Sequence, residues 1–210
     1  MQGLKLTALM SLAILLMGCS KTVQWEEEVP LNTGEVIWVK RSKLWVYKGG
    51  FGNPFDMAMR PTGEQTIRFK YAGIDYSFTG RAQVGWIAIA PDKTPMLIGI
   101  PGAFSWHSDH AYYCVIPYYV QFIPDKSGTT WTWPEKIEPW LYNLPANIMA
   151  STPGMGESLE ARYTAKDRDQ RDQNYRRENS YARVIDPLYD ARGACGKKYD
   201  PSMKPNWSNK

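Results

Sequence analysis

Two histidines and an aspartate stand together in the segment Trp106-His107-Ser108-Asp109-His110, and these are the only histidines in the 210-residue chain. Imidazole and carboxylate groups can hold a divalent metal or move a proton during hydrolysis. A spacing of three residues would place both histidines on one face of a helical turn. No third and fourth ligand is evident, however, and the segment lies between strand-like runs. We therefore predict no metal and no cofactor, and the catalytic residues stay unknown.

Other residues with nucleophilic chemistry lack the surroundings that this chemistry needs. Cys114 follows His110 by four residues, which allows a Cys–His nucleophile pair. Ser105 and Ser108 lack the G-x-S-x-G elbow of serine hydrolases. The glycine-rich run 49–52 has neither the G-x-G-x-x-G nor the P-loop frame. The sequence thus favours a binding protein over an enzyme, with an enzyme centred on His107, Asp109 and His110, such as a metal-assisted hydrolase, kept as an alternative.

The first residues have the layout of a secretory signal. Lys5 supplies a positive charge, Leu6 to Met17 is apolar, and the small residue Gly18 precedes Cys19. The apolar run is shorter than the ~20 residues that a membrane-spanning helix needs. We predict a signal peptide over residues 1–18.

The ending Leu16-Met17-Gly18-Cys19 resembles the lipobox of bacterial lipoproteins. The resemblance implies cleavage before Cys19 and a diacylglycerol on its sulfur, and Ser20 at the next position is typical of outer-membrane lipoproteins facing the periplasm. Two or more acyl chains hold a protein firmly on a membrane. Cys114 and Cys195 then remain as a single possible disulfide pair in an oxidising compartment.

Charge is mild and unevenly distributed along the chain. The formal net charge is +4, and residues 19–156 are neutral, so the excess lies mainly in residues 157–210. Nucleic-acid-binding proteins instead cluster their basic residues on one face. We predict no nucleic-acid partner.

Residues 25–150 are predicted to form one antiparallel β-domain, a sandwich or barrel, after a lipidated linker over residues 19–24. The clearest hairpin is Thr66 to Thr79, where apolar and polar residues alternate around Ala72-Gly73. Val84 to Ala90 and Met96 to Ile100 are almost wholly apolar, which indicates strands covered on both faces. Expected core residues are Ile67, Phe69, Tyr71, Trp86, Ile89, Leu97, Ile98, Val115 and Trp133, whereas Arg68, Lys70 and Asp75 should face solvent.

Residues 151–210 form a polar C-terminal region, predicted to be helical or partly disordered. We favour a solvated helix over Glu157 to Arg183. An apolar patch would dock the region on the β-domain, with the Cys114–Cys195 disulfide beyond it; this patch comprises Tyr181, Val184, Ile185, Leu188 and Tyr189.

Aromatic residues are the one compositional excess, with 9 Trp and 13 Tyr. Most should pack in the core, but an exposed group could bind a sugar ring, a peptide or a protein. Trp131 and Trp133 share a strand face by the period of two. The candidate ligand-binding residues are Trp106, His107, His110, Trp131 and Trp133.

Several motifs of the chain together resemble a group of uncharacterised proteobacterial lipoproteins. They are Trp25 to Val29, Gly34 to Ile37, Pro117 to Tyr119 and Trp131 to Pro134. The resemblance implies a location and no known activity. Our leading hypothesis is a non-enzymatic, lipid-anchored envelope protein that binds an envelope protein or a glycan through its β-domain. A carrier of a small apolar ligand is a further alternative.

Overall fold

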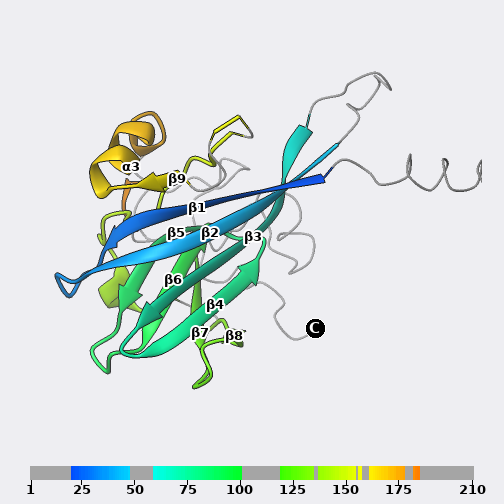
Figure 1. Ribbon diagram of the computed structural model, residues 1–210. Coiled ribbons are helices and arrows are strands. Elements are labelled where there is room, and N and C mark those ends of the chain that lie inside the picture. The colour runs from blue at the N-terminus through cyan, green and yellow to red at the C-terminus, as the bar shows by residue number, and fades with distance from the viewer. Residues whose placement is uncertain are drawn as a thin grey trace, which may run out of the picture.

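Two β-sheets face each other in this protein (Figure 1). The computed structural model describes residues 20–47, 59–100, 119–134, 137–154, 156–157, 161–177 and 182–184. The first sheet has the order β4-β3-β2-β1-β9 and the second has the order β5-β6-β7-β8. All pairs are antiparallel except the short β1–β9 pair. The predicted antiparallel sandwich is confirmed, and its strands are β1 (Ser20–Pro30), β2 (Val36–Tyr47), β3 (Met59–Tyr71), β4 (Ile74–Gly80), β5 (Gln83–Ile89), β6 (Pro95–Ile100), β7 (Val120–Pro124), β8 (Trp131–Thr132) and β9 (Ala161–Tyr163).

The β1–β2 hairpin begins earlier in the chain than the sequence indicated. Its loop lies at Asn32-Thr33-Gly34, as expected, but β1 starts at Ser20, which pairs with Val46. Residues 20–24, expected as a linker, therefore belong to the sheet. Val23 explains why these residues join the strand. It is fully buried and lies two residues before Trp25, so the two side chains share the buried face of β1.

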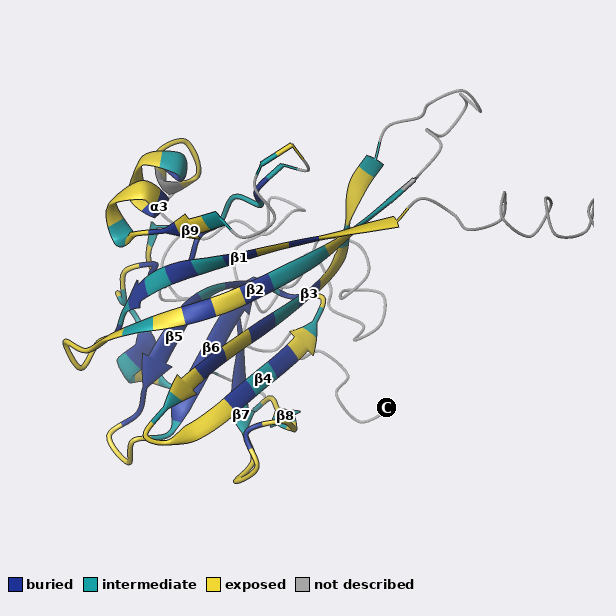
Figure 2. Cartoon of the chain, in the orientation of Figure 1, coloured by how far each residue is buried: buried dark blue, intermediate teal, exposed yellow. Residues whose placement is uncertain are grey.

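The β3–β4 hairpin has the predicted turn and register. Lys70 pairs with Asp75, and Ala72 and Gly73 both have positive φ angles of 49° and 84°. Two positive φ angles define the type I′ turn, whose twist suits two-residue hairpins. Arg68, Lys70 and Asp75 are exposed, as predicted (Figure 2).

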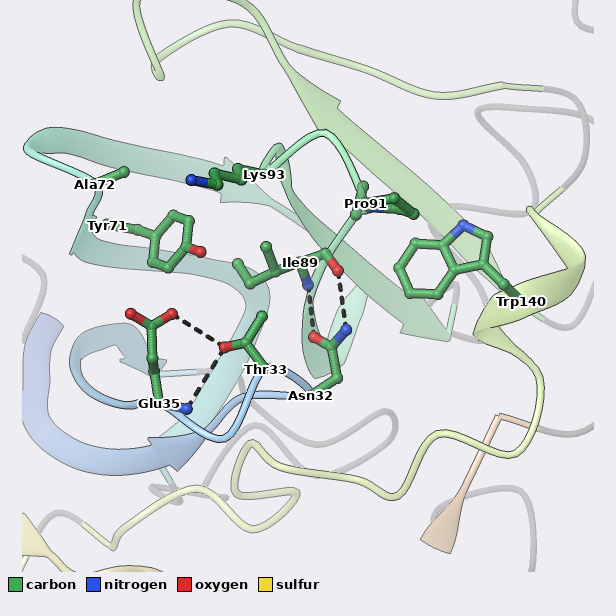
Figure 3. A pocket seen from close by; sticks show the side chains of 10 residues that line it. Asn32, Thr33, Glu35, Tyr71, Ala72, Ile89, Pro91, Lys93 and Trp140 are labelled. Atoms are coloured by element: carbon green, nitrogen blue, oxygen red, sulfur yellow. Dashed lines mark hydrogen bonds between the residues drawn. The ribbon is translucent and has the colours of Figure 1, made fainter.

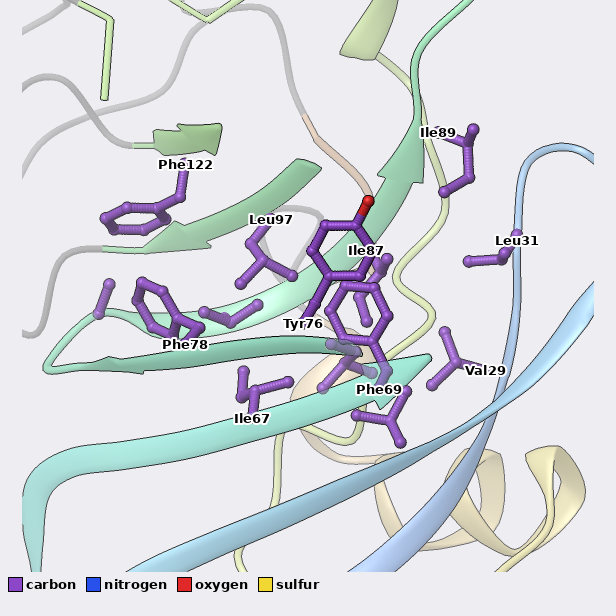
Figure 4. Close-up of a cluster of buried hydrophobic side chains, with 14 of the residues drawn as sticks. Val29, Leu31, Ile67, Phe69, Tyr76, Phe78, Ile87, Ile89, Leu97 and Phe122 are labelled. Atoms are coloured by element: carbon purple, nitrogen blue, oxygen red, sulfur yellow. The ribbon is translucent and has the colours of Figure 1, made fainter. Parts of the chain in front are cut away.

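The main core fills the space between the two sheets (Figure 4). Phe69 stacks on Tyr76 with ring centroids 5.1 Å apart, and Phe78 packs on Phe122 at 4.8 Å. The predicted burial of Ile67, Phe69, Trp86, Ile89, Leu97 and Ile98 is confirmed. Val115 lies outside the described residues.

Two expected core residues are more exposed than predicted. Tyr71 is only half-buried, because it is the last residue of β3 at the end of the sheet. Trp133 was predicted to be buried, and this is wrong: its exposed fraction is 39%. The strand β8 ends at Thr132, so the alternation that would have turned Trp133 inward stops before it.

The second sheet is covered on both faces, as its apolar strands indicated. On its outer side, Trp86 and Ile98 pack with Leu141 and Val184, which come from later segments of the chain. Leu141 belongs to the 3₁₀ helix Pro139–Leu141. Val184 is the one member of the predicted C-terminal patch within the described residues, and it is fully buried.

The long helix predicted over Glu157 to Arg183 is wrong. Ala161–Tyr163 instead forms β9, and the helix α3 covers only Ala165–Arg171, followed by a short 3₁₀ turn over Tyr175–Arg177. Thr164 begins α3 with a capping box, in which its hydroxyl accepts from the Asp167 backbone and the Asp167 carboxylate accepts in return. No helix among the described residues is long and apolar enough to cross a membrane.

Buried charges dock this region on the sandwich together with the apolar side chains of Tyr163 and Val184. Arg168 donates to the carbonyl of Asn147 at 2.6 Å, and its exposed fraction is 3%. The fully buried carboxylate of Asp172 accepts from the backbone of Ala150 at 2.7 Å and of Ser151 at 3.0 Å. A charged group leaves water only where such partners replace its hydration.

A second buried ionic group lies between β1 and β2. Arg41 donates to Glu27 at 2.8 Å, to the carbonyl of Met149 at 2.6 Å and to Gln65 at 2.6 Å. Glu27 is fully buried, and its other oxygen accepts from the Met149 backbone at 2.6 Å. The guanidinium also lies 4.9 Å from the ring centroid of Trp25, within cation–π range. The pair therefore ties the segment around Met149 to the first sheet.

Replacing Arg41 by alanine should leave the Glu27 carboxylate buried without its cation. We expect the free energy of unfolding to fall by about 3–5 kcal/mol, measured by urea denaturation. Lys40→Ala is the control: Lys40 directly precedes Arg41, its side chain is 74% exposed and it pairs with Glu26 at the surface. That variant should lose no more than about 1 kcal/mol. Similar small losses in both variants would contradict a structural role for the buried pair.

The pH dependence of stability should report on Glu157. Its carboxylate pairs with Arg171 at 2.8 Å and accepts from the Gly154 backbone and the Tyr163 hydroxyl, so its pKa falls from 4.5 to about 2, chiefly through the Arg171 hydrogen bond. A lowered pKa means that the carboxylate stabilises the folded state above its ordinary pKa and that this stability is lost as the pH falls from 4.5 toward 2.

The test compares urea denaturation of the parent chain and Glu157→Gln from neutral pH down to about pH 2. Because the side chain is 35% exposed, solvent screening reduces the expected difference at neutral pH to about 1 kcal/mol. This difference should shrink through the acid range. Glu64→Gln, an exposed carboxylate on β3, supplies the baseline. A difference that stays constant down to the lowest pH would refute the assignment.

Candidate functional site

Most of the residues that the sequence singled out lie outside the described part of the chain. These are Cys19, Trp106, His107, Asp109, His110, Cys114 and Cys195. The predicted disulfide, the lipidation site and the histidine cluster therefore stay predictions. Among the described residues, no group of His, Cys, Asp and Glu could hold a metal ion.

Trp131 and Trp133 contribute to packing more than to an open surface. Trp131 is half-buried, its ring lies 5.7 Å from that of Phe78, and its indole N–H donates to the carbonyl of Ser77 at 2.8 Å. Trp133 lies 6.4 Å from Phe122, measured between ring centroids. Neither ring lines the cavities described below.

A large cavity lies where three hairpin loops meet at one end of the sandwich (Figure 3). We call it the loop-end cavity. Its volume is about 610 Å³, which falls in the range of ligand sites in proteins. The β1–β2 loop, the β3–β4 turn and the β5–β6 loop form its walls, and the 3₁₀ helix adds one side chain. The lining residues are Asn32, Thr33, Glu35, Tyr71, Ala72, Ile89, Ala90, Pro91, Lys93 and Trp140.

Asn32 joins the two sheets beneath this cavity. Its side-chain amide donates to the carbonyl of Ile89 at 2.9 Å and accepts from the backbone N–H of the same residue at 2.7 Å. Asn147 does the same for Ile87, at 2.7 and 2.9 Å. The strand β5 is at the edge of its sheet, so two asparagines stand in for the missing strand partner.

The walls of the loop-end cavity combine aromatic, apolar and polar groups. Tyr71 and Trp140 lie on opposite sides, with Ile89 and Pro91 between them (Figure 3). The Trp140 indole N–H is held by the Glu138 carboxylate at 2.5 Å, which fixes the orientation of the ring.

Three polar side chains add hydrogen-bonding groups to this wall. The Thr33 hydroxyl donates to Glu35 at 3.0 Å, and the ammonium of Lys93 comes from the β5–β6 loop. Burial, and then the negative charge of Glu35, raise the pKa of the Tyr71 hydroxyl above its ordinary value.

This arrangement supports binding better than catalysis. Glycoside hydrolysis needs two carboxyl groups that flank the reacting bond, and Glu35 is the only carboxylate among the lining residues that the structure describes. Acyl transfer needs a nucleophile with an adjacent base, and the lining supplies Thr33 without a histidine. The groups present can instead hold a ring against an aromatic face and bond its polar substituents.

Sequence reasoning predicted the three hairpin loops but did not bring them together. The strands pair β1 with β2, β3 with β4 and β5 with β6, so the three turns lie at the same end of the sandwich. Nothing in the sequence indicated that Trp140 would line this cavity, because the segment that carries it reaches the cavity by packing around the second sheet.

No protein-family model, curated protein or solved structure matches this chain.

Proposed function

We propose that this chain is a lipid-anchored protein of the bacterial cell envelope that binds a glycan in the loop-end cavity without converting it. The carrying observation is the placement of Tyr71 and Trp140 on opposite sides of an apolar floor, with the polar groups of Thr33, Glu35 and Lys93 around it. Sugar rings present apolar faces and peripheral hydroxyls, which suit such a wall.

Backbone conformation supports the same location. Non-glycine residues with positive φ are uncommon, and they gather at functional sites when the surrounding structure fixes them. In the described part of the chain, Ala72, Lys93 and Asn143 have this conformation, and the first two line the loop-end cavity.

The anchor is supported by the lipobox resemblance at Cys19 and by the start of β1 at Ser20. With so short a connection, a lipid on Cys19 would hold the first sheet close to the bilayer. The alternative of an apolar-ligand carrier receives less support, because apolar side chains fill the space between the described parts of the two sheets.

Chitotetraose is a suitable neutral probe for the loop-end cavity, with binding followed by isothermal titration calorimetry on the purified chain. Trp140→Ala removes one aromatic wall and should weaken binding about tenfold. Trp133→Ala is the matched control, since this tryptophan is also part-exposed but lies outside the cavity. If Trp133→Ala abolished binding and Trp140→Ala retained it, the site would lie at the β8 end of the sandwich, and the proposal would be refuted.

The anchor is tested by Cys19→Ser, which removes the acyl acceptor. We expect no palmitate incorporation in labelled cells, and the variant should leave the membrane fraction or accumulate uncleaved. Ser20→Ala, the neighbouring substitution that keeps the thiol, should still be labelled. Persistent labelling of Cys19→Ser would rule out the lipobox interpretation.

A further inference from the structure

A second cavity lies on the outer face of the first sheet, away from the loop-end cavity. It has a volume of about 360 Å³ and spans β1, β2 and β3, with one residue from β9. We call it the outer basin. Figure 2 shows these strands side by side, with exposed residues alternating with buried ones along β2 and β3.

Like charges oppose each other in the outer basin. Lys40 on β2 is the direct cross-strand partner of Arg68 on β3. Like charges in this position destabilise a sheet. Glu26 is the one carboxylate among the lining residues that the structure describes, and it is shared between Lys40 at 3.2 Å and Arg162 at 3.0 Å. Three cations therefore face one anion, which gives the outer basin a local excess of positive charge.

Arg68 and two neutral neighbours have unused hydrogen-bonding groups. Arg68 makes no ion pair or hydrogen bond through its side chain with any residue that the structure describes, although its guanidinium carries five N–H donors. The side chains of Gln24 and Ser42 in the same basin likewise have no protein partner in the described part of the chain. An amide, a hydroxyl and a guanidinium thus converge on one hollow of the sheet.

Arg162 is held in place by more than its ion pair. Its guanidinium lies 4.2 Å from the ring centroid of Trp38, which is 40% exposed on the same face. This stacking fixes one cationic side of the basin before any ligand arrives, and a fixed cation loses less conformational entropy on binding.

We propose that the outer basin binds an acidic sugar, with the anionic group on Arg68 and Lys40 and the hydroxyls on Gln24 and Ser42. A guanidinium fork matches the two oxygens of a carboxylate or a phosphate. Neutral hydrogen-bonding groups beside the cations favour a hydroxyl-rich acid over a plain anion. This site is separate from the loop-end cavity and goes beyond the proposed function.

The test is isothermal titration calorimetry of the full chain with trigalacturonate, at low salt and at about 0.5 M salt. Arg68→Gln should weaken binding about tenfold, and Gln24→Ala about threefold. Lys70→Gln is the matched control: it removes a cation two residues along the same strand and the same face, and it lies outside the basin. The affinity of Lys70→Gln for trigalacturonate should stay within about twofold of that of the parent chain.

Three further ligands decide between outcomes. Maltotriose, which lacks the charge, should bind at least about tenfold more weakly than trigalacturonate. Triglutamate should also bind more weakly, and equal affinity for it would show a general anion site and overturn the assignment to a sugar. Saturating chitotetraose should not displace trigalacturonate, because the two ligands bind in different cavities. The acidic-sugar proposal can therefore fail or succeed independently of the proposal for the loop-end cavity. Unchanged affinity in Arg68→Gln would overturn the proposal.

Discussion

The buried charge of Arg41 is the constraint on which the rest of this structure depends. Removing a guanidinium from water costs several kcal/mol unless close partners replace its hydration. Here the partners come from three separate parts of the chain: Glu27 on β1, Gln65 on β3 and the backbone of Met149. The backbone N–H of Met149 donates to Glu27, and its carbonyl accepts from Arg41, so both polar groups of this peptide segment are fixed. The position of that segment then decides what packs beyond it.

Several contacts outside the core depend on this fixed segment. Two residues before Met149, the Asn147 side chain completes the open edge of β5. Just after Met149, the backbone N–H groups of residues 150 and 151 donate to the Asp172 carboxylate. The Asn147 carbonyl accepts a hydrogen bond from Arg168. The C-terminal region is thereby joined to the sandwich through hydrogen bonds that need defined directions. Such contacts specify one arrangement more strictly than apolar contacts of the same area.

The two cavities use the sandwich in different ways. The loop-end cavity is formed by turns, and Asn32 holds the β1–β2 loop against β5 beneath it. The outer basin lies on the middle of a sheet, where cross-strand register alone places Lys40 opposite Arg68. Loops supply variety at the first site, and the rigid sheet supplies fixed spacing at the second. The two proposals accordingly assign a neutral glycan to the first cavity and an acidic sugar to the second.

Local pattern determined the strands, because alternation and turn residues act over short distances. The sequence alone predicted the hairpin turns at Asn32 to Gly34 and at Ala72-Gly73, and the two-sided burial of β5 and β6. The inward positions of Glu27 and Arg41, which lie two residues from Trp25 and Val39 and so share their strand face, were also present in the sequence. A charge at an inward position, however, shows only that a partner is needed.

Tertiary structure alone decided which partners meet. The polar run after Glu157 has a helix-like composition, yet pairing with β1 made part of it a strand. Buried charges add to the apolar contact of Val184 in docking the C-terminal region. Trp140 reached the loop-end cavity by packing around the second sheet. Arg162 reached the outer basin through contacts with Glu26 and Trp38, more than a hundred residues earlier in the chain. Sequence periodicity reports which face of an element is buried, whereas the partner of a buried or opposed charge depends on how the whole chain packs.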